Sequence, residues 1–161
     1  MSALQLKTRE RAIYLLTGPQ SGAVLAAAGL PLPEAQLSAE ERPGALVART
    51  GRDEYLAVLA PELPELRHEW CFRRHDALFE LAGSGWVELM AHLCQYDFRQ
   101  LAPGGWLMAS VAGVNAWLYH EIESGSLLIG VDPGFRHYFN ATISAVLDDL
   151  SATRKLTGEA S

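Results

Sequence analysis

The chain contains few cysteines. Only Cys71 and Cys94 occur among its 161 residues, 23 positions apart and without a CxxC pair. Two cysteines cannot make a four-cysteine metal site, and secreted domains held by disulfides normally carry more. The sequence therefore predicts reduced thiols and a cytoplasmic protein.

Positive charge is also scarce. The 13 Lys and Arg are outnumbered by 19 Asp and Glu, which gives a formal net charge of −6. The longest basic clusters, Arg73-Arg74 and Arg154-Lys155, have two residues each. Because binding to a phosphate backbone needs a basic patch, we expect no nucleic-acid partner.

The sequence has no long apolar segment. Its longest apolar run, Ala23 to Leu32, is interrupted by Gly29 and Pro31, whereas a transmembrane helix needs about 20 apolar residues. The N-terminal stretch MSALQLKTRE is polar and has no apolar signal-peptide core. We therefore expect no membrane segment and no secretory leader.

Hydrophobic residues still make up 49% of the chain, as in ordinary globular proteins. Their spacing separates short alternating segments from segments of helical period. The predicted strands are 11–17, 44–50, 54–59, 71–74, 77–82, 106–111, 114–120 and 126–131. The predicted helices are 19–28, 61–67, 85–93 and 133–150, the last two capped by Ser84 and Asp132, and 30–43 is a predicted loop.

Two stretches repeat one pattern. YLLTGPQSGAVLAAAG (14–29) and FELAGSGWVELMAHLC (79–94) each predict a strand, a glycine and a helix. We therefore predict a single α+β domain over residues 1–150, with two β-α-β-β-α-like halves at about 10–68 and 70–150. Helices would pack on a mainly antiparallel sheet. The polar residues 151–161 predict a flexible tail.

The stretch HLCQYDF (92–98) places a cysteine, a histidine and a carboxylate close together in sequence. At the C-terminal end of a helix, the dipole raises rather than lowers the pKa of a thiol such as Cys94. His92 would point to a different face of that helix. We expect structural roles only: Cys94 as a small buried side chain, Tyr96 and Phe98 as anchors, and Asp97 as an acceptor for loop backbone.

No other constellation predicts a site. The five histidines (68, 75, 92, 120 and 137) form no HxH, HxxxH or HExxH pair. His75 and Asp76 would point apart on extended chain, so they predict a polar turn. Gly83-Ser84-Gly85 precedes a helix but lacks the third glycine and the lysine of a phosphate loop, and it does not form GxSxG. We predict no catalytic, cofactor-binding or metal-binding residue.

Aromatic residues gather near the start of the last predicted helix. Phe135, Tyr138 and Phe139 have helical spacing and are expected in the core, whereas Arg136 and His137 lie off that stripe. Because Arg and aromatic residues are enriched at interfaces, this segment is a candidate docking edge.

The order of these segments resembles the gamma subunit of heterotetrameric sarcosine oxidase, a relative of the folate-binding domain of the glycine cleavage T-protein. Three stretches carry the resemblance: TGRDEYLAVLAP (50–61), FELAGSGWVELMAHLCQYDFRQLAPGGW (79–106) and VDPGFRHYFNATI (131–143). The positions that match the family are Gly51, Asp53, Glu54, Tyr55, Leu56, Gly83, Asp97 and Arg136. The departures are Phe98 for a leucine, His137, Tyr138, and Phe139 displaced by one position.

This resemblance implies a non-catalytic small subunit of a flavin-dependent complex that oxidatively demethylates an N-methyl amine such as sarcosine. In that family FAD, FMN, NAD and tetrahydrofolate belong to the larger subunits. The resemblance therefore implies no cofactor on this chain, no activity of the chain alone, and larger flavin- and folate-binding partners in a hetero-oligomer. Related folate enzymes carry an acidic pair in a hairpin where this chain has Asn115, Ala116 and Trp117.

Two other functions stay open at this point. The first is a free-standing folate-binding or one-carbon-transfer protein, which needs a carboxylate near the pterin. Asp97, Glu121 and Asp132 are the candidate donors. The second is an α+β interaction domain unrelated to amine oxidation.

Overall fold

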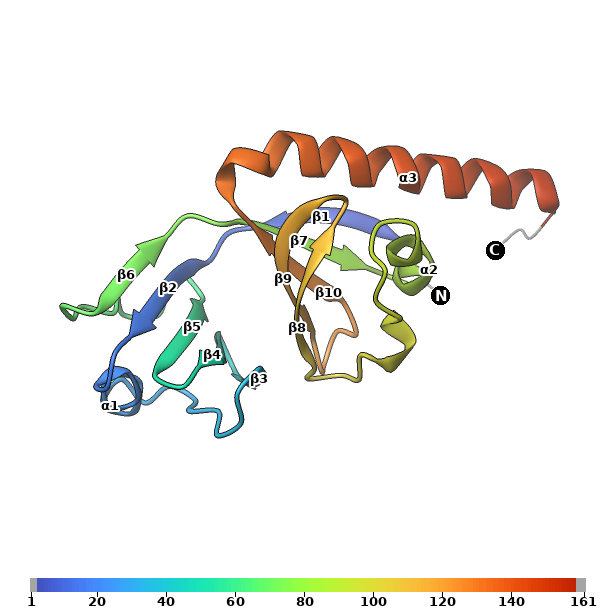
Figure 1. Cartoon of the computed structure of the whole chain (residues 1–161). Helices are drawn as coiled ribbons and strands as arrows, with labels where there is room; N and C mark the ends of the chain where they lie inside the picture. The colour runs from blue at the N-terminus through green and yellow to red at the C-terminus, as the bar shows by residue number, and fades with distance from the viewer. Residues whose placement is uncertain (1–2, 159–161) are drawn as a thin grey trace. The chain divides into compact units, whose positions relative to one another are not determined.

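The structure is a computed structural model in which residues 3–158 are described. Within that range the chain forms ten β-strands and three α-helices, and the strands divide between two five-stranded sheets (Figure 1). Each sheet belongs to one compact unit. The first unit comprises residues 10–76 with 104–106, and the second comprises the described parts of 1–9, 77–103 and 107–161. The predicted α+β class with mainly antiparallel strands is confirmed.

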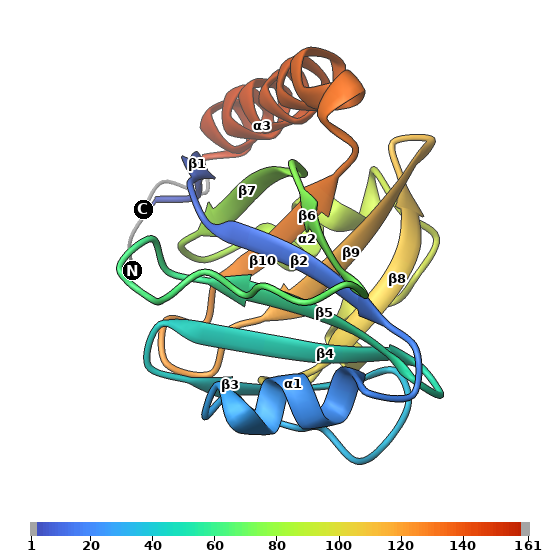
Figure 2. The ribbon, with the colours of Figure 1, turned by 90° about the vertical axis from the view of Figure 1, so that its left-hand side faces the viewer.

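The first unit contains one helix and five strands in the order β3-β4-β5-β2-β6. Its elements are β2 (Ala12–Thr17), α1 (Ser21–Ala27), β3 (Ser38–Arg42), β4 (Ala45–Gly51), β5 (Glu54–Leu59) and β6 (Cys71–Arg74). Alternate side chains of the strands form one core with Leu25 of α1. Leu25, Val47 and Ala57 are fully buried in this core. Figure 2 shows α1 lying along this sheet.

The second unit has the strand order β1-β7-β10-β9-β8. Its elements are β1 (Gln5–Arg9), β7 (Ala77–Ala82), α2 (Trp86–Ala91), the 3₁₀ helix η1 (Phe98–Gln100), β8 (Trp106–Val111), β9 (Val114–His120), β10 (Leu127–Val131), the 3₁₀ helix η2 (Pro133–Phe135) and α3 (Arg136–Thr157). Phe139 and Ile143 lie one turn apart on α3 and are fully buried in the core of this unit. Figure 1 shows α3 running along the sheet of the second unit.

The two sheets have matching topology. In each, the strand next to one edge, β2 or β7, is followed by a left-handed glycine, Gly18 (φ +101°) or Gly83 (φ +100°), and then by a helix. Each of these two strands pairs with an edge strand that directly precedes the other one in sequence. Thus β1 leads into β2 but pairs with β7, and β6 leads into β7 but pairs with β2. The order of the strands in sequence would therefore place β1 and β6 in the wrong sheets.

The structure corrects several predicted elements. Residues 30–43 were expected to be a loop, yet β3 pairs there with β4. Residues 61–67 do not form the predicted helix, because Pro64 can neither donate a backbone hydrogen bond nor fit the preceding turn of a helix. Ser84 is not the cap of α2; the N-cap is Gly85 at φ +97°, without a side-chain hydrogen bond.

Helix α3 extends into the segment 151–161 that was expected to be a flexible tail. Helix α3 continues to Thr157 and ends at Gly158, which adopts φ +73°. The Ser151 hydroxyl donates to the Leu147 carbonyl over 2.8 Å, and Arg154 pairs with Glu88. Residues 159–161 of that tail lie outside the described range. No helix among the described residues is both long enough and apolar enough to cross a membrane.

Candidate functional site

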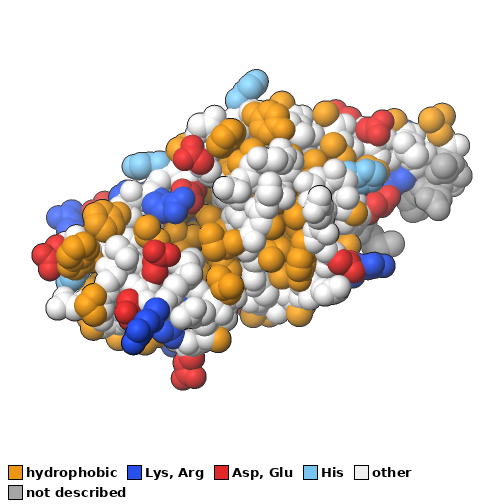
Figure 3. Space-filling model, in the orientation of Figure 1, with side chains coloured by type: hydrophobic (Ala, Val, Ile, Leu, Met, Phe, Trp, Pro, Cys, Tyr) orange, Lys and Arg blue, Asp and Glu red, His pale blue; other side chains and the backbone are white. Residues whose placement is uncertain are grey.

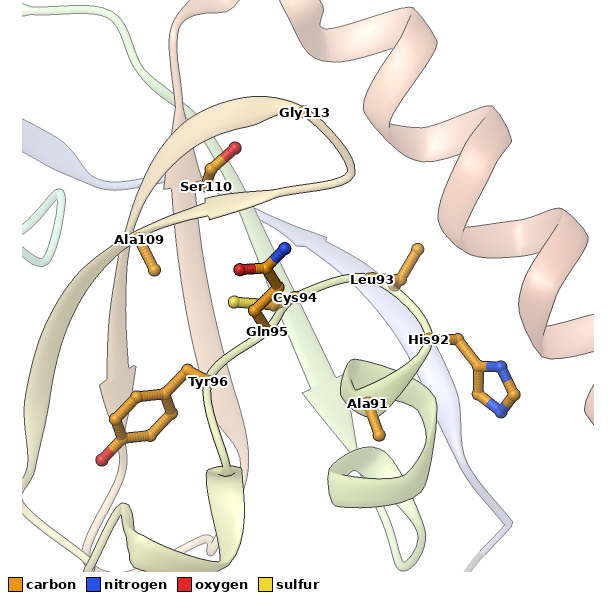
Figure 4. A pocket seen from close by; sticks show the side chains of 9 residues that line it. All are labelled: Ala91, His92, Leu93, Cys94, Gln95, Tyr96, Ala109, Ser110 and Gly113. Carbon is orange, nitrogen blue, oxygen red and sulfur yellow. The ribbon is translucent and has the colours of Figure 1, made fainter.

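A cavity of about 590 Å³ opens beside the C-terminal end of α2 (Figure 4). Its walls come from the segment that follows α2 and from the hairpin formed by β8 and β9. The lining residues are Ala91, His92, Leu93, Cys94, Gln95, Tyr96, Ala109, Ser110 and Gly113. Most of the HLCQYDF stretch therefore lines the cavity, including Cys94. The expectation that Cys94 is buried is wrong, because its side chain lines this open cavity and is only half-buried.

The position of Cys94 is fixed by the way α2 ends. The N–H groups of Leu93 and Cys94 both donate to the Met90 carbonyl, over 3.0 and 2.9 Å. The N–H of Ala112, at the tip of the hairpin, then donates to the Leu93 carbonyl over 2.7 Å. This bond ties the segment after α2 to the hairpin.

The residues that follow Cys94 hold the chain to the core. Phe98 is only 3% exposed, and its ring meets that of Tyr96 at 5.2 Å in an edge-on contact. Trp86 of α2 also meets Phe98 edge-on, at 6.1 Å. The predicted anchoring role of Tyr96 and Phe98 is confirmed.

Asp97 accepts hydrogen bonds from the backbone and side chain of one residue. Its Oδ1 accepts from the Arg99 N–H over 3.2 Å, and its two carboxylate oxygens accept from the Arg99 guanidinium over 2.8 Å each. These bonds from Arg99 lower the pKa of Asp97 to about 2. The carboxylate caps η1, as expected for an acceptor of loop backbone.

The cavity has polar groups but no base aimed at the thiol. Figure 4 shows the His92 ring pointing away from Cys94, and the Tyr96 ring pointing to another side. The other polar side chains that line the cavity are the amide of Gln95 and the hydroxyl of Ser110, neither of which accepts a proton near neutral pH. The arrangement can hold a small molecule by hydrogen bonds, but it does not activate a nucleophile.

The second cysteine is equally unsuited to catalysis. Cys71 lies on β6, half-buried, and burial raises the pKa of its thiol. Its Sγ lies 4.0 Å from the Leu66 carbonyl. A thiol that is protonated at neutral pH is a weak nucleophile and a weak metal ligand.

The three carboxylates considered for folate binding are each engaged in local structure. Asp97 caps η1, and Asp132 accepts from the Gly134 N–H over 2.8 Å at the start of η2, as the predicted cap. Glu121 accepts from the Ser124 hydroxyl over 2.7 Å within a tight turn. Across the described residues, no three His, Cys, Asp or Glu side chains form a group that could hold a metal ion.

The histidines also have structural settings. His120 Nδ1 lies 2.8 Å from the Leu101 carbonyl, and its ring packs edge-on against Trp86 at 5.0 Å. His68 Nε2 lies 3.2 Å from the Gln20 amide oxygen. His75 is exposed in the two-residue connection between β6 and β7, while its neighbour Asp76 pairs with Arg74 over 2.9 Å. The predicted polar turn at His75-Asp76 is not formed, because these two residues connect strands that belong to different sheets.

One buried carboxylate was not singled out from the sequence. Glu80, in the apolar strand β7, is 3% exposed and pairs with Arg9 of β1. Burial raises the pKa of Glu80, but hydrogen bonds from Arg9 and Ser126, together with the charges of Arg9 and Lys7, outweigh it and leave the pKa lowered. The sequence does contain a signal for this pair: Glu80 is the only charged residue in the apolar run ALFELA. A charge buried in such a strand needs a partner.

The aromatic cluster near α3 is only partly in the core. Phe139 is fully buried, but Phe135 and Tyr138 are 47% and 49% exposed. The expectation that all three lie in the core is wrong, because η2 holds Phe135 outside the helix. The Tyr138 hydroxyl instead donates to the Ala112 carbonyl over 2.8 Å. Arg136 and His137 are exposed, as expected.

Comparisons with known proteins give one informative result. No protein-family model matches the chain, and no curated protein matches it. Among solved structures, the chain is similar to a chain of "Heterotetrameric Sarcosine Oxidase from Corynebacterium sp. U-96 in complex with pyrrole 2-carboxylate". The match covers 92% of this chain and 84% of that one, with a TM-score of 0.72 and 21% sequence identity. The protein therefore has the fold of a sarcosine oxidase chain, which confirms at the level of fold the resemblance found in the sequence.

Proposed function

We propose that this chain is a non-catalytic, gamma-type small subunit of a flavin-dependent, sarcosine oxidase-like complex that oxidatively demethylates an N-methyl amine. The observation that carries the proposal is the fold shared over 92% of the chain with a chain of heterotetrameric sarcosine oxidase. The stretches at 50–61, 79–106 and 131–143, which resemble the gamma subunit in sequence, support the same assignment.

The side chains of this chain support a role without catalysis. Cys94 has no base beside it in its cavity, and the carboxylates of Asp97, Glu121 and Asp132 are engaged in caps and turns. Amine oxidation by a flavin needs the flavin ring beside the substrate, and the chemistry belongs to that cofactor. In the proposal, the chemistry therefore takes place in larger partner chains.

The cofactors of the proposed complex belong to those partners. We expect FAD, FMN, NAD and tetrahydrofolate there, because this chain presents neither a phosphate loop nor the acidic pair of related folate enzymes. At that pair's place, Asn115 is exposed whereas Ala116 and Trp117 are buried. A cytoplasmic location agrees with Cys71 and Cys94, which are both free thiols.

The isolated chain provides the first test. The purified chain should show no visible absorbance of flavin and no sarcosine-dependent oxygen consumption. Stoichiometric bound flavin, or turnover of an N-methyl amine by the chain alone, would contradict a non-catalytic role.

Folate binding by the free chain is the second candidate. The cavity of about 590 Å³ beside Cys94 is large enough to admit part of such a ligand. Titration with tetrahydrofolate, followed by tryptophan fluorescence, separates the two functions because Trp86 and Trp117 lie in the same unit as this cavity. We expect no saturable quenching; saturation at one equivalent would favour the folate-binding protein.

A further inference from the structure

Strand β6 (Cys71–Arg74) is an edge of the sheet in the first unit. The Thr17 N–H donates to the Trp70 carbonyl over 3.0 Å, so Trp70 and every second residue after it turn their backbone groups toward β2. The backbone groups of Cys71 and Arg73 therefore point away from the sheet. The Cys71 N–H donates a hydrogen bond to the His68 carbonyl over 3.1 Å, so it is not available to a further strand. The outward backbone of Arg73 remains available to a further strand.

Two large aromatic side chains lie exposed along this edge. Phe72 lies on β6 and Trp70 in the turn directly before it, and they are 47% and 50% exposed. Figure 3 shows hydrophobic side chains at the surface near β6, beside charged ones. Proteins usually protect sheet edges with charge, and clustered exposed apolar side chains mark interaction sites. An open edge with two exposed aromatics is therefore a surface suited to a partner.

Arg73 lies on the opposite face of β6. A groove of about 490 Å³ lies there, and its charged lining residues are Arg11, Arg73, Glu10 and Glu65. The Arg73 guanidinium lies over the Tyr14 ring at 5.0 Å, and within residues 3–158 neither arginine is in an ion pair. The nearby Arg74 and Arg67, by contrast, are paired within the chain. The free charge of Arg73 thus stands out in a chain whose net charge is −6.

We propose that β6 is a docking edge at which an extended segment of a larger partner chain adds as a sixth strand. This inference rests on the proposed function, which requires such a partner. The added segment would place a carboxylate opposite Arg73 and apolar side chains beside Trp70 and Phe72, because opposite residues of paired strands share a face. The partner segment is therefore one in which acidic and apolar residues alternate.

The same geometry disfavours a second copy of this chain as the occupant. Antiparallel pairing of two β6 strands about their outward backbone would place Arg73 opposite Arg73. Like charges directly opposite each other destabilise a strand pair. An acidic residue opposite Arg73 removes that repulsion.

The test compares variants of the tagged full chain, expressed in the native cell. Arg73→Pro removes the outward N–H and is compatible with an edge strand, where the N–H faces solvent. Arg73→Glu and Phe72→Asp change exposed side chains without altering the backbone. Arg52→Glu, in the exposed turn between β4 and β5, has the same charge change and is the matched control. Met108→Asp, at the exposed edge strand β8, is the control for the other sheet.

The readout is the amount of flavin-bearing larger chains that copurify with equal amounts of folded variant, with folding checked by circular dichroism. We expect about a tenfold or greater loss for the three β6 variants and none for the two controls. Equal capture by wild type and the β6 variants would overturn the docking edge and leave the proposed function standing.

Two other outcomes overturn the inference by different routes. A wild-type chain that captures no flavin-bearing partner would overturn the proposed function together with the docking edge. A homodimer detected by light scattering and abolished by Arg73→Pro would assign β6 to a second copy of the chain. If Arg73→Pro fails to fold, the two side-chain variants decide the result.

Discussion

The indole of Trp117 lies directly over Gly130, its cross-strand partner on β10. A Cβ atom added to Gly130 would come within 2.0 Å of Trp117 Cε2 and 2.2 Å of Nε1. Both residues belong to the second unit, and Trp117 is only 5% exposed. The strand position is thus occupied by glycine because the ring fills the space that a side chain would need.

Gly130→Ala should therefore destabilise the protein. Because a buried ring must move to admit the methyl group, we expect a loss of ~1–3 kcal/mol in the free energy of unfolding, measured by urea denaturation. The control is Gly22→Ala in α1, where a Cβ would meet Leu32 at an ordinary 3.5 Å. That variant should gain up to ~1 kcal/mol from helix propensity. An unchanged midpoint for Gly130→Ala would show that the indole does not constrain this position.

The pairing of Arg9 with Glu80 can be tested by a double-mutant cycle. Arg9→Met leaves a buried carboxylate without its main partner and should cost ~2–4 kcal/mol; the Arg9 side chain is 46% exposed, which limits the effect. Adding Glu80→Met removes the stranded charge and should recover most of the loss. Thermal or urea unfolding of the four proteins measures the coupling. Losses that simply add would mean that the two residues do not interact.

Acid unfolding should report on Asp97. Its pKa is lowered to about 2 in the folded protein from an ordinary value of 3.8. The stabilisation is therefore fully present above pH 3.8 and is lost as the pH falls through about 2. Asp97→Asn should be less stable than wild type at pH 5, and the difference should shrink as the pH approaches 2. A constant difference across that range would assign the effect to packing instead of charge.

Cys94 should be dispensable for oxidation of the amine by the complex. Since no base lies beside its thiol, Cys94→Ala should leave the rate of sarcosine-dependent oxygen consumption by the purified complex unchanged. Cys94→Ser is the conservative control, because it keeps a small polar group in the cavity. A large loss of activity with Cys94→Ala that Cys94→Ser restores would show that this cavity takes part in turnover.

Local patterns predicted the elements that are rich in apolar residues and bounded by turns. The strand 54–59 was predicted at the observed bounds of β5, since Tyr55 to Leu59 are aromatic or aliphatic and Arg52 and Asp53 form the turn before it. The left-handed glycines before α1 and α2 were also recognisable as strand-to-helix turns. These features depend on residues close together in sequence, where sterics and periodicity decide the conformation.

The remaining elements depend on distant pairing. The strand β1 has the polar sequence QLKTR and forms by pairing with β7, about 70 positions away. Likewise β3, with the sequence SAEER, is a strand through its pairing with β4. The burial of Glu80 required its partner Arg9 to be located first. The open edge of β6 and its exposed aromatics could not be predicted, because the sequence does not say which strand ends a sheet.

In the proposed function, this chain is a subunit of a flavin-dependent amine oxidase. The most direct test is affinity isolation of the tagged full chain from its native cell, followed by denaturing electrophoresis and a visible absorbance spectrum of the eluate. The account predicts larger partner chains in stoichiometric amounts, the absorbance bands of bound flavin, and oxygen consumption with an N-methyl amine. A colourless eluate that contains this chain alone would contradict it.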